Sequence, residues 1–301
     1  MIPFSKALND CYDKIVEFIE TFYSFLEGIP QQNNELNDLA KKSVDNFMGV
    51  VIKNSLMEHA QNSKNLAQVL LIKSNLECFE LLCACLESIL AAKIYSSKVA
   101  LNSRAAFQSV QAMIQYKIFE LVNSKIDEFL SISEYDRCPK QSATQPSQYI
   151  RDIVGFLSSL CDSTSESAQK YEQGLYFTGF NHLVDSLTAL INDTSFKVIN
   201  FNFLKNLELD LIFLNSFTEE IGNPNIFNGF IELDQTIKLL LSDKIHEFLD
   251  ASVRNKKYSR VKIPQLISLC SRLKEHNYEN DAYCKQKQRM IEDFLKILKP
   301  K

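Results

Sequence analysis

Histidine is the side chain best suited to acid–base and metal chemistry near neutral pH, and this chain contains four of them: His59, His182, His246 and His276. The first three lie in different predicted helices, and His276 directly follows a fourth. None has the His-Glu-x-x-His or His-x-x-His spacing that places two metal ligands on one helical face. The histidines are therefore better explained as satisfied surface or core residues than as a metal site.

Motifs that bind phosphates or activate a nucleophile are absent from the sequence. It contains no GxxxxGKS/T, GxGxxG or GxSxG segment, and its seven glycines leave little material for a phosphate-binding loop. The acid pairs Glu219-Glu220 and Glu292-Asp293 lie on polar helical faces, where adjacent residues do not face each other. We therefore expect no enzymatic activity, no metal and no cofactor.

The eight cysteines, most of which lie among apolar helical residues, do not suggest a disulfide framework or a metal site. Cys83 and Cys85 are two positions apart and so lie on different faces of a helix, where they cannot share one metal ion. The first residues lack the apolar core of a secretory signal, and no apolar run approaches the ~20 residues of a membrane span. We therefore expect reduced thiols in a cytoplasmic protein.

Charge is unevenly distributed along the chain. The formal net charge is −4, which argues against a general nucleic-acid binder. Residues 253–301 contain 13 Lys/Arg and 5 Asp/Glu, so this end is +8 and the remainder is −4 − 8 = −12. A basic end on an acidic body suits an anionic membrane or an acidic partner. Solvated helix faces near the C-terminus are the simpler explanation.

One basic cluster surrounds an aromatic residue: Arg254, Lys256, Lys257 and Arg260 lie on either side of Tyr258. These cations are candidates for contact with phosphates or lipid headgroups. A solvated loop between helices is the simpler alternative. Most of the 21 Phe positions follow apolar stripes, so the aromatic residues are predicted to form cores and not base-stacking surfaces.

Helices are predicted to position all of these residues. Seven Gly and seven Pro in 301 residues indicate few turns, and apolar residues recur with the period of a helix. In the second helix, the residues predicted to face inward are Leu36, Leu39, Val44, Phe47, Val51, Ile52 and Leu56. We predict an all-α protein of about ten helices, over residues 4–27, 34–60, 65–95, 103 into 123–137, 149–161, 165–191, 198–221, 230–249, 265–275 and 281–298.

A change of pattern near the middle of the chain predicts two units. Residues 123–137 resemble the end of a long helix, and Cys138-Pro139 stops it because proline lacks an N–H and restricts the residue before it. Residues 140–147 are polar and small, and the helical pattern resumes at Gln148. We therefore expect helical-bundle subdomains at 1–139 and 140–301.

Several sequence blocks together carry a family resemblance. The most specific is KIDEFL at 125–130, followed by Tyr135-Asp136. Weaker blocks keep their order and rough spacing over nearly the whole chain, at residues 3–6, 35–43, 149–157, 209–210, 230–233 and 258–264. The set resembles the C-terminal region of the Sec-fifteen family of exocyst subunits.

This resemblance implies a fold and a set of partners. The family has an elongated rod of stacked helical bundles, shared with other multisubunit tethers. Its members tether secretory vesicles to the plasma membrane as effectors of a GTP-bound Rab GTPase, and they bind other exocyst subunits and polarity or motor proteins. The resemblance therefore implies a peripheral protein at secretory vesicles and sites of exocytosis, and a chain that is a fragment of a longer subunit.

The Rab contact is expected on exposed residues of the predicted 198–221 helix, with Lys205, Glu208 and Asp210 as candidates. Glu208 stands where the family commonly has a polar amide. Two alternatives remain open. One is a scaffold with only subunit–subunit contacts, and the other is a peripheral phospholipid binder that uses the basic residues at 254–262.

Overall fold

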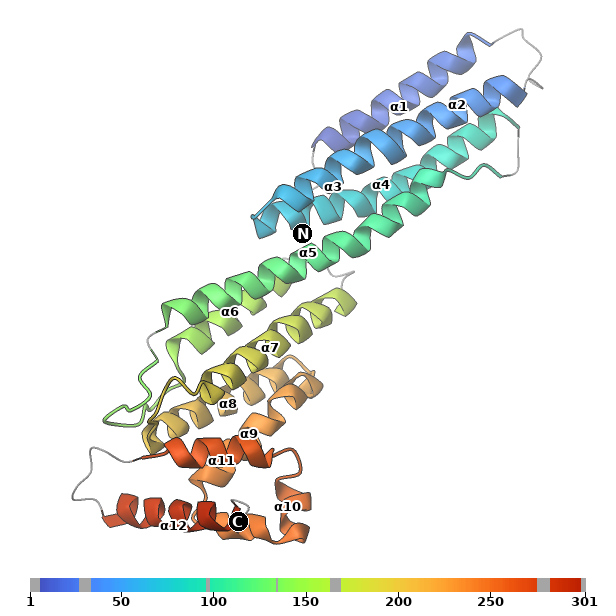
Figure 1. The fold of residues 1–301 in the computed structure, drawn as a ribbon. Helices are drawn as coiled ribbons and strands as arrows, with labels where there is room; N and C mark the ends of the chain where they lie inside the picture. Colours follow the sequence, from blue (N-terminus) through green and yellow to red (C-terminus); the bar gives the residue numbers. More distant parts are fainter. Residues whose placement is uncertain are drawn as a thin grey trace. The chain divides into compact units, whose positions relative to one another are not determined.

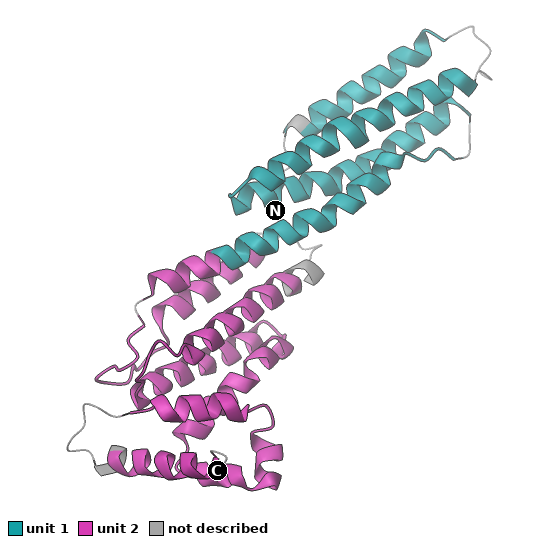
Figure 2. Cartoon of the chain, in the orientation of Figure 1, with its two compact units in different colours: residues 1–124, 163–165 teal, residues 125–162, 166–301 magenta. Residues whose placement is uncertain are grey.

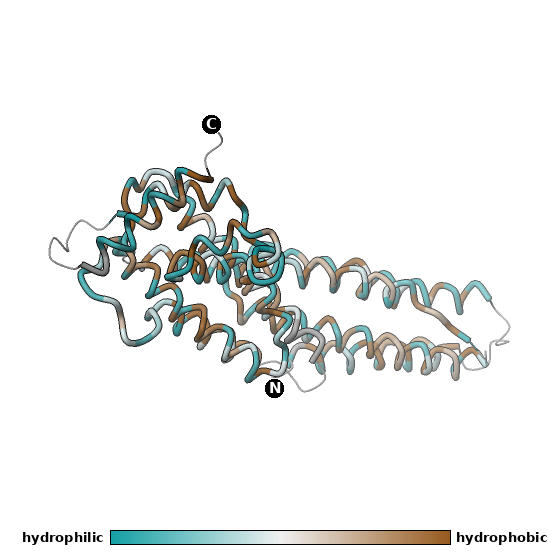
Figure 3. The backbone as a smooth tube through the Cα atoms, turned by 90° about the horizontal axis from the view of Figure 1, so that it is seen from below, coloured by the Kyte–Doolittle hydropathy of each residue, from teal (hydrophilic) through white to brown (hydrophobic). Residues whose placement is uncertain are grey.

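The computed structural model describes residues 6–26, 34–95, 98–133, 135–162, 169–274 and 282–298, and its elements are helices (Figure 1). Within these ranges there is no named strand, only one isolated parallel bridge between Ile199 and Leu273. The predicted all-α fold is therefore confirmed. Individual helices carry both hydrophobic and hydrophilic residues along their length, as amphipathic helices do (Figure 3).

Two compact units divide the chain, one of residues 1–124 with 163–165 and the other of residues 125–162 with 166–301 (Figure 2). The division falls inside one helix, α5 (Asn102–Ile132). The subdomain boundary expected at 139/140 stays a prediction, because a division by internal contacts does not tell whether either part folds alone.

Unit 1 is a helical bundle. Its elements are α1 (Lys6–Ser24), α2 (Asn34–Asn46), the π-helical segment η1 (Phe47–Ile52), α3 (Lys53–Asn62), α4 (Leu66–Lys93) and the first part of α5. Helix α4 packs against both α1 and α3, and its Phe79 ring stacks on Phe107 of α5 at 5.7 Å. Because α4 contacts three neighbours, it is apolar on most sides.

The buried face of the second predicted helix differs from the prediction. Leu39, Phe47 and Val51 are 52%, 41% and 54% exposed. Val44 is buried as predicted, together with Ala40, Met48 and Ala60. Beyond residue 47 the π-helical segment contributes to the difference, because its i→i+5 bonding gives more residues per turn than the α-helix and so shifts the buried face of α3 relative to that of α2.

Unit 2 contains the remaining helices. These are α6 (Gln148–Asp162), α7 (Gln169–Asn192), α8 (Phe201–Glu220), the 3₁₀ segment η3 (Pro224–Phe230), α9 (Ile231–Leu241), the 3₁₀ segment η4 (Ile245–Leu249), α10 (Ala251–Lys257), α11 (Ile263–Arg272) and α12 (Ala282–Leu298). Its core holds the rings of Phe180, Phe217 and Phe230, with Phe180 6.0 Å from Phe217 and 6.1 Å from Phe230.

Two predicted elements of unit 2 are corrected. Residues 230–249, predicted as one helix, form α9 between two 3₁₀ segments, and α9 ends where Ser242 is extended. The loop predicted at 253–263 begins as helix α10, because the Asp250 carboxylate accepts the backbone N–H of Ser252 at 2.7 Å and caps it. Pro264 lies in the first turn of α11, where a proline costs no intrahelical hydrogen bond. The first residues of the helix predicted at 165–191 lie outside the described residues.

Candidate functional surfaces

Asp210 is held inside unit 2 by three donors. Its carboxylate accepts the backbone N–H of Ser147 at 2.6 Å, the Ser147 hydroxyl at 2.8 Å and the Tyr149 hydroxyl at 3.3 Å. Only 1% of the residue is exposed. The expectation that Asp210 is an exposed contact residue is therefore wrong. Its contacts run to the start of α6 and do not reach the surface.

Residues 137–147, which connect α5 to α6, are fastened along α8. The Asn206 side chain accepts the backbone N–H of Ala143 at 2.7 Å. The carbonyl of Pro139 accepts from the side-chain amides of Asn200 at 2.9 Å and Asn202 at 3.1 Å. The connection therefore covers one face of α8.

The pKa values in this cluster follow from burial. Burial raises the pKa of Asp210, although the donors from Ser147 and Tyr149 oppose that rise. Burial also raises the pKa of Tyr149, whose ring is 5.3 Å from that of Tyr135, and it raises the pKa of Tyr135 to about 12. Both phenols therefore stay protonated near neutral pH, and Tyr149 keeps its role as a donor to Asp210.

The outward face of α8 carries the other two candidates on this helix. Lys205 is exposed and Glu208 is half-buried. Ile212, which follows Glu208 by one turn, is 53% exposed. Sequence reasoning missed Ile212. The signal was available, because an apolar residue outside the stripe of Leu204, Leu207, Leu211 and Leu214 is expected to be exposed. Lys205, Glu208 and Ile212 together are called the outer α8 face below.

The four basic candidates lie on α10 and the turn after it. Lys256, Lys257 and Arg260 are exposed, and Arg254 is half-buried with its guanidinium 5.8 Å from the centre of the Phe248 ring. Lys257 approaches Glu247 at 3.5 Å. The structure therefore brings these four residues together on one short segment.

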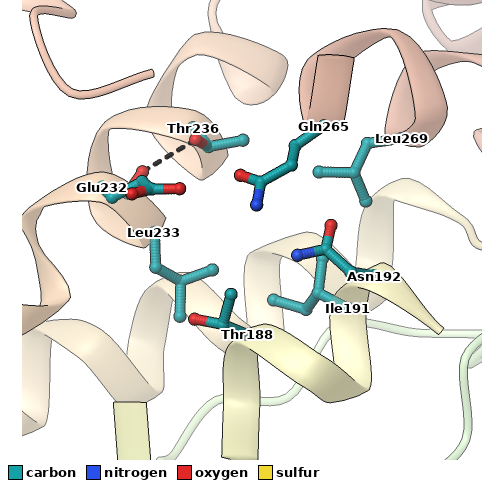
Figure 4. Close-up of a pocket in the computed structure, with 8 residues that line it drawn as sticks. All are labelled: Thr188, Ile191, Asn192, Glu232, Leu233, Thr236, Gln265 and Leu269. Atoms are coloured by element: carbon teal, nitrogen blue, oxygen red, sulfur yellow. Dashed lines mark hydrogen bonds between the residues drawn. The ribbon is translucent and has the colours of Figure 1, made fainter. Parts of the chain in front are cut away.

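A small polar pocket lies between α7, α9 and α11 (Figure 4). Its volume is about 20 Å³, which is room for about one water molecule. The Oε1 atom of Glu232 is buried there without a hydrogen-bond partner, while Oε2 pairs with Lys262 at 2.8 Å. A pocket of this size admits no organic substrate. Its lining residues are Thr188, Ile191, Asn192, Glu232, Leu233, Thr236, Gln265 and Leu269.

A larger apolar groove of about 510 Å³ lies between α3 and α5 of unit 1. Met57, Ala60 and Ile114 contribute to its lining, together with Met113 and Tyr116, which are 50% and 73% exposed. Its charged residues, Lys117 and Glu120, pair with each other at 3.1 Å. Such a surface has the composition of a protein contact.

The three histidines that the structure describes do not form a site together. His59 bonds to the carbonyl of Ser55 at 2.7 Å, and His182 pairs with Asp127 at 2.7 Å. The His246 ring packs 6.0 Å from Phe294, and His276 is outside the described residues. In the described ranges no group of three or more His, Cys, Asp or Glu residues could hold a metal ion. In the same ranges, no helix has both the length and the apolar character needed to cross a membrane.

Comparison with known families decides the assignment. Residues 1–272 match the family described as Exocyst complex subunit Sec15 C-terminal. The chain belongs to this family. The resemblance seen in the sequence blocks is therefore confirmed. The crystal structure of a Sec15 C-terminal domain has a similar fold, with a TM-score of 0.61 and 21% identity over 79% of this chain and 77% of that one.

Curated relatives of this chain are exocyst components. Exocyst complex component 6 of Dictyostelium discoideum is 25% identical over 98% of this chain and 31% of its own length. Exocyst complex component 6B of Homo sapiens is 24% identical over 99% of this chain and 39% of its own. Exocyst complex component sec15 of Schizosaccharomyces pombe is 25% identical over 99% and 41%. The chain thus spans about a third to two fifths of the length of these relatives.

Proposed function

We propose that this chain is part of a non-catalytic exocyst subunit that tethers secretory vesicles to the plasma membrane before fusion. The observation that carries the proposal is the family match across residues 1–272. The all-α fold and the two cavities described above agree with a role in binding other proteins, because one cavity holds about one water and the other is apolar. The protein then acts in the cytoplasm, peripherally at secretory vesicles and sites of exocytosis.

The finer proposal is that the chain is an effector of a vesicle Rab GTPase and recognises its GTP-bound state through the outer α8 face. GTP orders the switch loops of such GTPases and hydrolysis releases them, so a rigid helix that docks on the ordered loops binds one state only. Lys205 and Glu208 offer charges of both signs, and Ile212 adds an exposed apolar contact. Asp210 is not part of this surface, because it is buried.

The test is a pull-down with secretory-vesicle Rab GTPases locked in the GTP or GDP state. We expect retention of the GTP form only, and we expect the variant Lys205→Glu with Ile212→Asp to lose it by about tenfold or more. The matched control is Lys42→Glu with Val50→Asp, since both residues are exposed on α2 and η1. Equal binding of the two nucleotide states would refute the effector role.

A scaffold role is the first alternative, and the apolar groove between α3 and α5 favours it. Met113 and Tyr116 are exposed there, and residues of these types are enriched in protein interfaces. Its partners would be other exocyst subunits, with polarity or motor proteins as further candidates. Binding of exocyst subunits that is unaffected by Met113→Asp and Tyr116→Asp would reject the groove as their contact.

Peripheral binding of phospholipid is the second alternative. The basic segment at α10 favours it, because Lys256, Lys257 and Arg260 are exposed close together. Binding of this kind is independent of the nucleotide state of any GTPase, so the pull-down does not measure it.

A further inference from the structure

The segment from η4 to the start of α11, residues 244–263, is called the α10 surface here. It contains six Lys/Arg and two Asp/Glu, a net charge of 6 − 2 = +4, in a chain whose net charge is −4. The rest of the chain therefore carries −8. Between residues 251 and 263 there are five cations and no acid. This charge is of opposite sign to that of the remainder and is concentrated in a few turns.

Part of this positive charge is not neutralised by neighbouring acids. Glu247 lies 3.8 Å from Lys244 and 3.5 Å from Lys257, so one carboxylate is shared by two lysines. Within the part of the chain that the structure describes, Lys256 and Arg260 form no ion pair, and both are exposed. These two cations are therefore available to an external anion.

The exposed cations are held on a fixed scaffold. The guanidinium of Arg254 lies over the Phe248 ring, and Phe248 itself is fully buried. The backbone N–H of Arg260 donates to the side chain of Gln235 at 2.9 Å, which ties the turn to α9. Lys262 is tied to the same helix through Glu232 at 2.8 Å. Little conformational entropy is then lost when this surface binds.

Apolar side chains stand at both ends of the cationic stretch. Leu249, just before α10, and Ile263, just after the turn, are each 38% exposed. Cations with adjacent exposed aliphatic residues are the combination found at membrane interfaces, where the charges meet lipid phosphates and the aliphatic groups enter the headgroup region.

We propose that the α10 surface docks on an anionic phospholipid bilayer. Lys256 and Arg260 contact lipid phosphates, and Leu249 and Ile263 enter the headgroup layer on either side of them. The inference deepens the peripheral-lipid alternative of the proposed function and does not depend on Rab binding. The net charge of −8 on the rest of the chain is repelled by an anionic membrane, so this surface is the one that faces the lipid.

A bilayer fits these observations better than an acidic peptide does. The cations are spread over a helix and a turn, and neither of the two cavities described above lies among them. Acidic peptide motifs are typically bound by clusters of arginine, whereas only one of the two exposed cations without an ion pair, Arg260, is an arginine. A broad cationic surface suits a broad anionic one, and it reads charge density and not a single headgroup.

The test is co-sedimentation of the whole chain with vesicles. One set is pure phosphatidylcholine, and the other contains about 30% phosphatidylserine. We expect binding to the anionic set only, with a steep fall between about 0.1 M and about 0.5 M salt because screening shortens the reach of the charges. We expect Lys256→Glu with Arg260→Glu to reduce the partition coefficient by at least about 25-fold, at roughly fivefold for each lost cation.

The matched control is Lys42→Glu with Lys64→Glu, which changes the net charge equally at two exposed lysines of unit 1. This control retains binding to within about threefold if the α10 surface is the site. Equal loss in the two double variants would overturn the proposal, since only the total charge would then matter. Binding to the pure phosphatidylcholine vesicles that equals binding to the anionic vesicles would also overturn it, and so would the absence of binding to the anionic vesicles.

A second ligand distinguishes docking on a bilayer from binding to an acidic protein. Soluble poly-glutamate is added to the anionic vesicles at matched charge. Displacement of the chain into a stable complex with the polymer would point to an acidic protein partner and overturn the membrane assignment. The Lys256→Glu, Arg260→Glu variant is also used in the Rab pull-down. The two proposals together predict that this variant loses lipid binding and keeps GTP-dependent Rab binding. Lipid binding that persists counts against the α10 surface, and loss of Rab binding counts against the outer α8 face.

Discussion

Arg272, at the end of α11, donates from its guanidinium to the carbonyl of Ile191, in the last turn of α7, at 2.7 Å. A second guanidinium nitrogen donates to the carbonyl of Asp193 at 2.7 Å. The last carbonyls of a helix lack intrahelical partners and carry partial negative charge, so this buried cation satisfies them. The contact joins two helices that are about 80 residues apart in sequence, and thereby holds the C-terminal part of unit 2 on α7.

Replacing Arg272 tests this contact. Arg272→Met keeps most of the apolar volume but leaves the carbonyls of Ile191 and Asp193 without their donor, so we expect a loss of about 2–4 kcal/mol in the free energy of unfolding. Urea denaturation measures it. Arg289→Met, at an exposed position of α12, is the control and changes the free energy by about 0.5 kcal/mol or less. Equal effects of the two substitutions would contradict the capping role.

The buried carboxylate of Asp210 gives a second prediction. Asp210→Ala leaves the Ser147 N–H and hydroxyl unpaired, and we expect a loss of about 2–4 kcal/mol in the free energy of unfolding. Amide hydrogen exchange at Ala143 and Ser147 should become faster at the same time, because their segment is fastened through Asn206 and Asp210. Glu208→Ala on the same helix is the control, with little change expected in either measurement.

The direction in which the pKa of Asp210 is shifted determines how stability changes with pH. Burial raises the pKa of Asp210 in the folded state above its ordinary value of about 4. Between those two values the folded state binds more protons than the unfolded state, so the contribution of this group to stability falls as pH rises through that window. The advantage of the native chain over Asp210→Asn should therefore shrink between about pH 4 and the raised pKa of Asp210.

This comparison uses the same urea measurement at several pH values. Burying the carboxylate costs free energy, but replacing it leaves donors without an acceptor. We therefore expect the native chain to have the higher free energy of unfolding at each pH. The difference from Asp210→Asn becomes smaller as the pH rises. A gap that widens with rising pH would show that the pKa of Asp210 is lowered by its donors and not raised by burial.

Cysteine reactivity gives a further prediction. Burial raises the pKa of the Cys83 thiol to about 11 and that of Cys270 to about 12. At pH 8 about one thiol in a thousand at Cys83, and fewer at Cys270, is then the reactive thiolate. We expect a thiol reagent followed by peptide mass spectrometry to label exposed Cys85 in the folded protein and to label Cys83 and Cys270 only in denaturant. Equal labelling of Cys83 and Cys85 without denaturant would contradict the burial of Cys83.

The correction at Asp210 shows where sequence reasoning stops. The sequence pattern correctly predicts that position 210 lies in a helix, and local spacing predicts the apolar stripe of that helix. Its exposure depended on Ser147 and Tyr149, which are 63 and 61 residues away. Helical periodicity predicts which side of a helix is apolar. It does not predict that a polar connection, here residues 137–147, packs over another side of the same helix.

The sequence by itself determined most of the helices, their approximate ends and the family, because these depend on local periodicity, on proline and glycine, and on blocks that keep their order. The tertiary structure decided which residues face outward. The π-helical segment at residues 47–52 shifts the apolar face of α3 relative to that of α2. The Asp250 cap that begins α10 is a local contact, between residues two apart, which the sequence reasoning missed. The burial of Asp210 depends instead on Ser147 and Tyr149, which are distant in sequence, and a local pattern cannot contain such contacts.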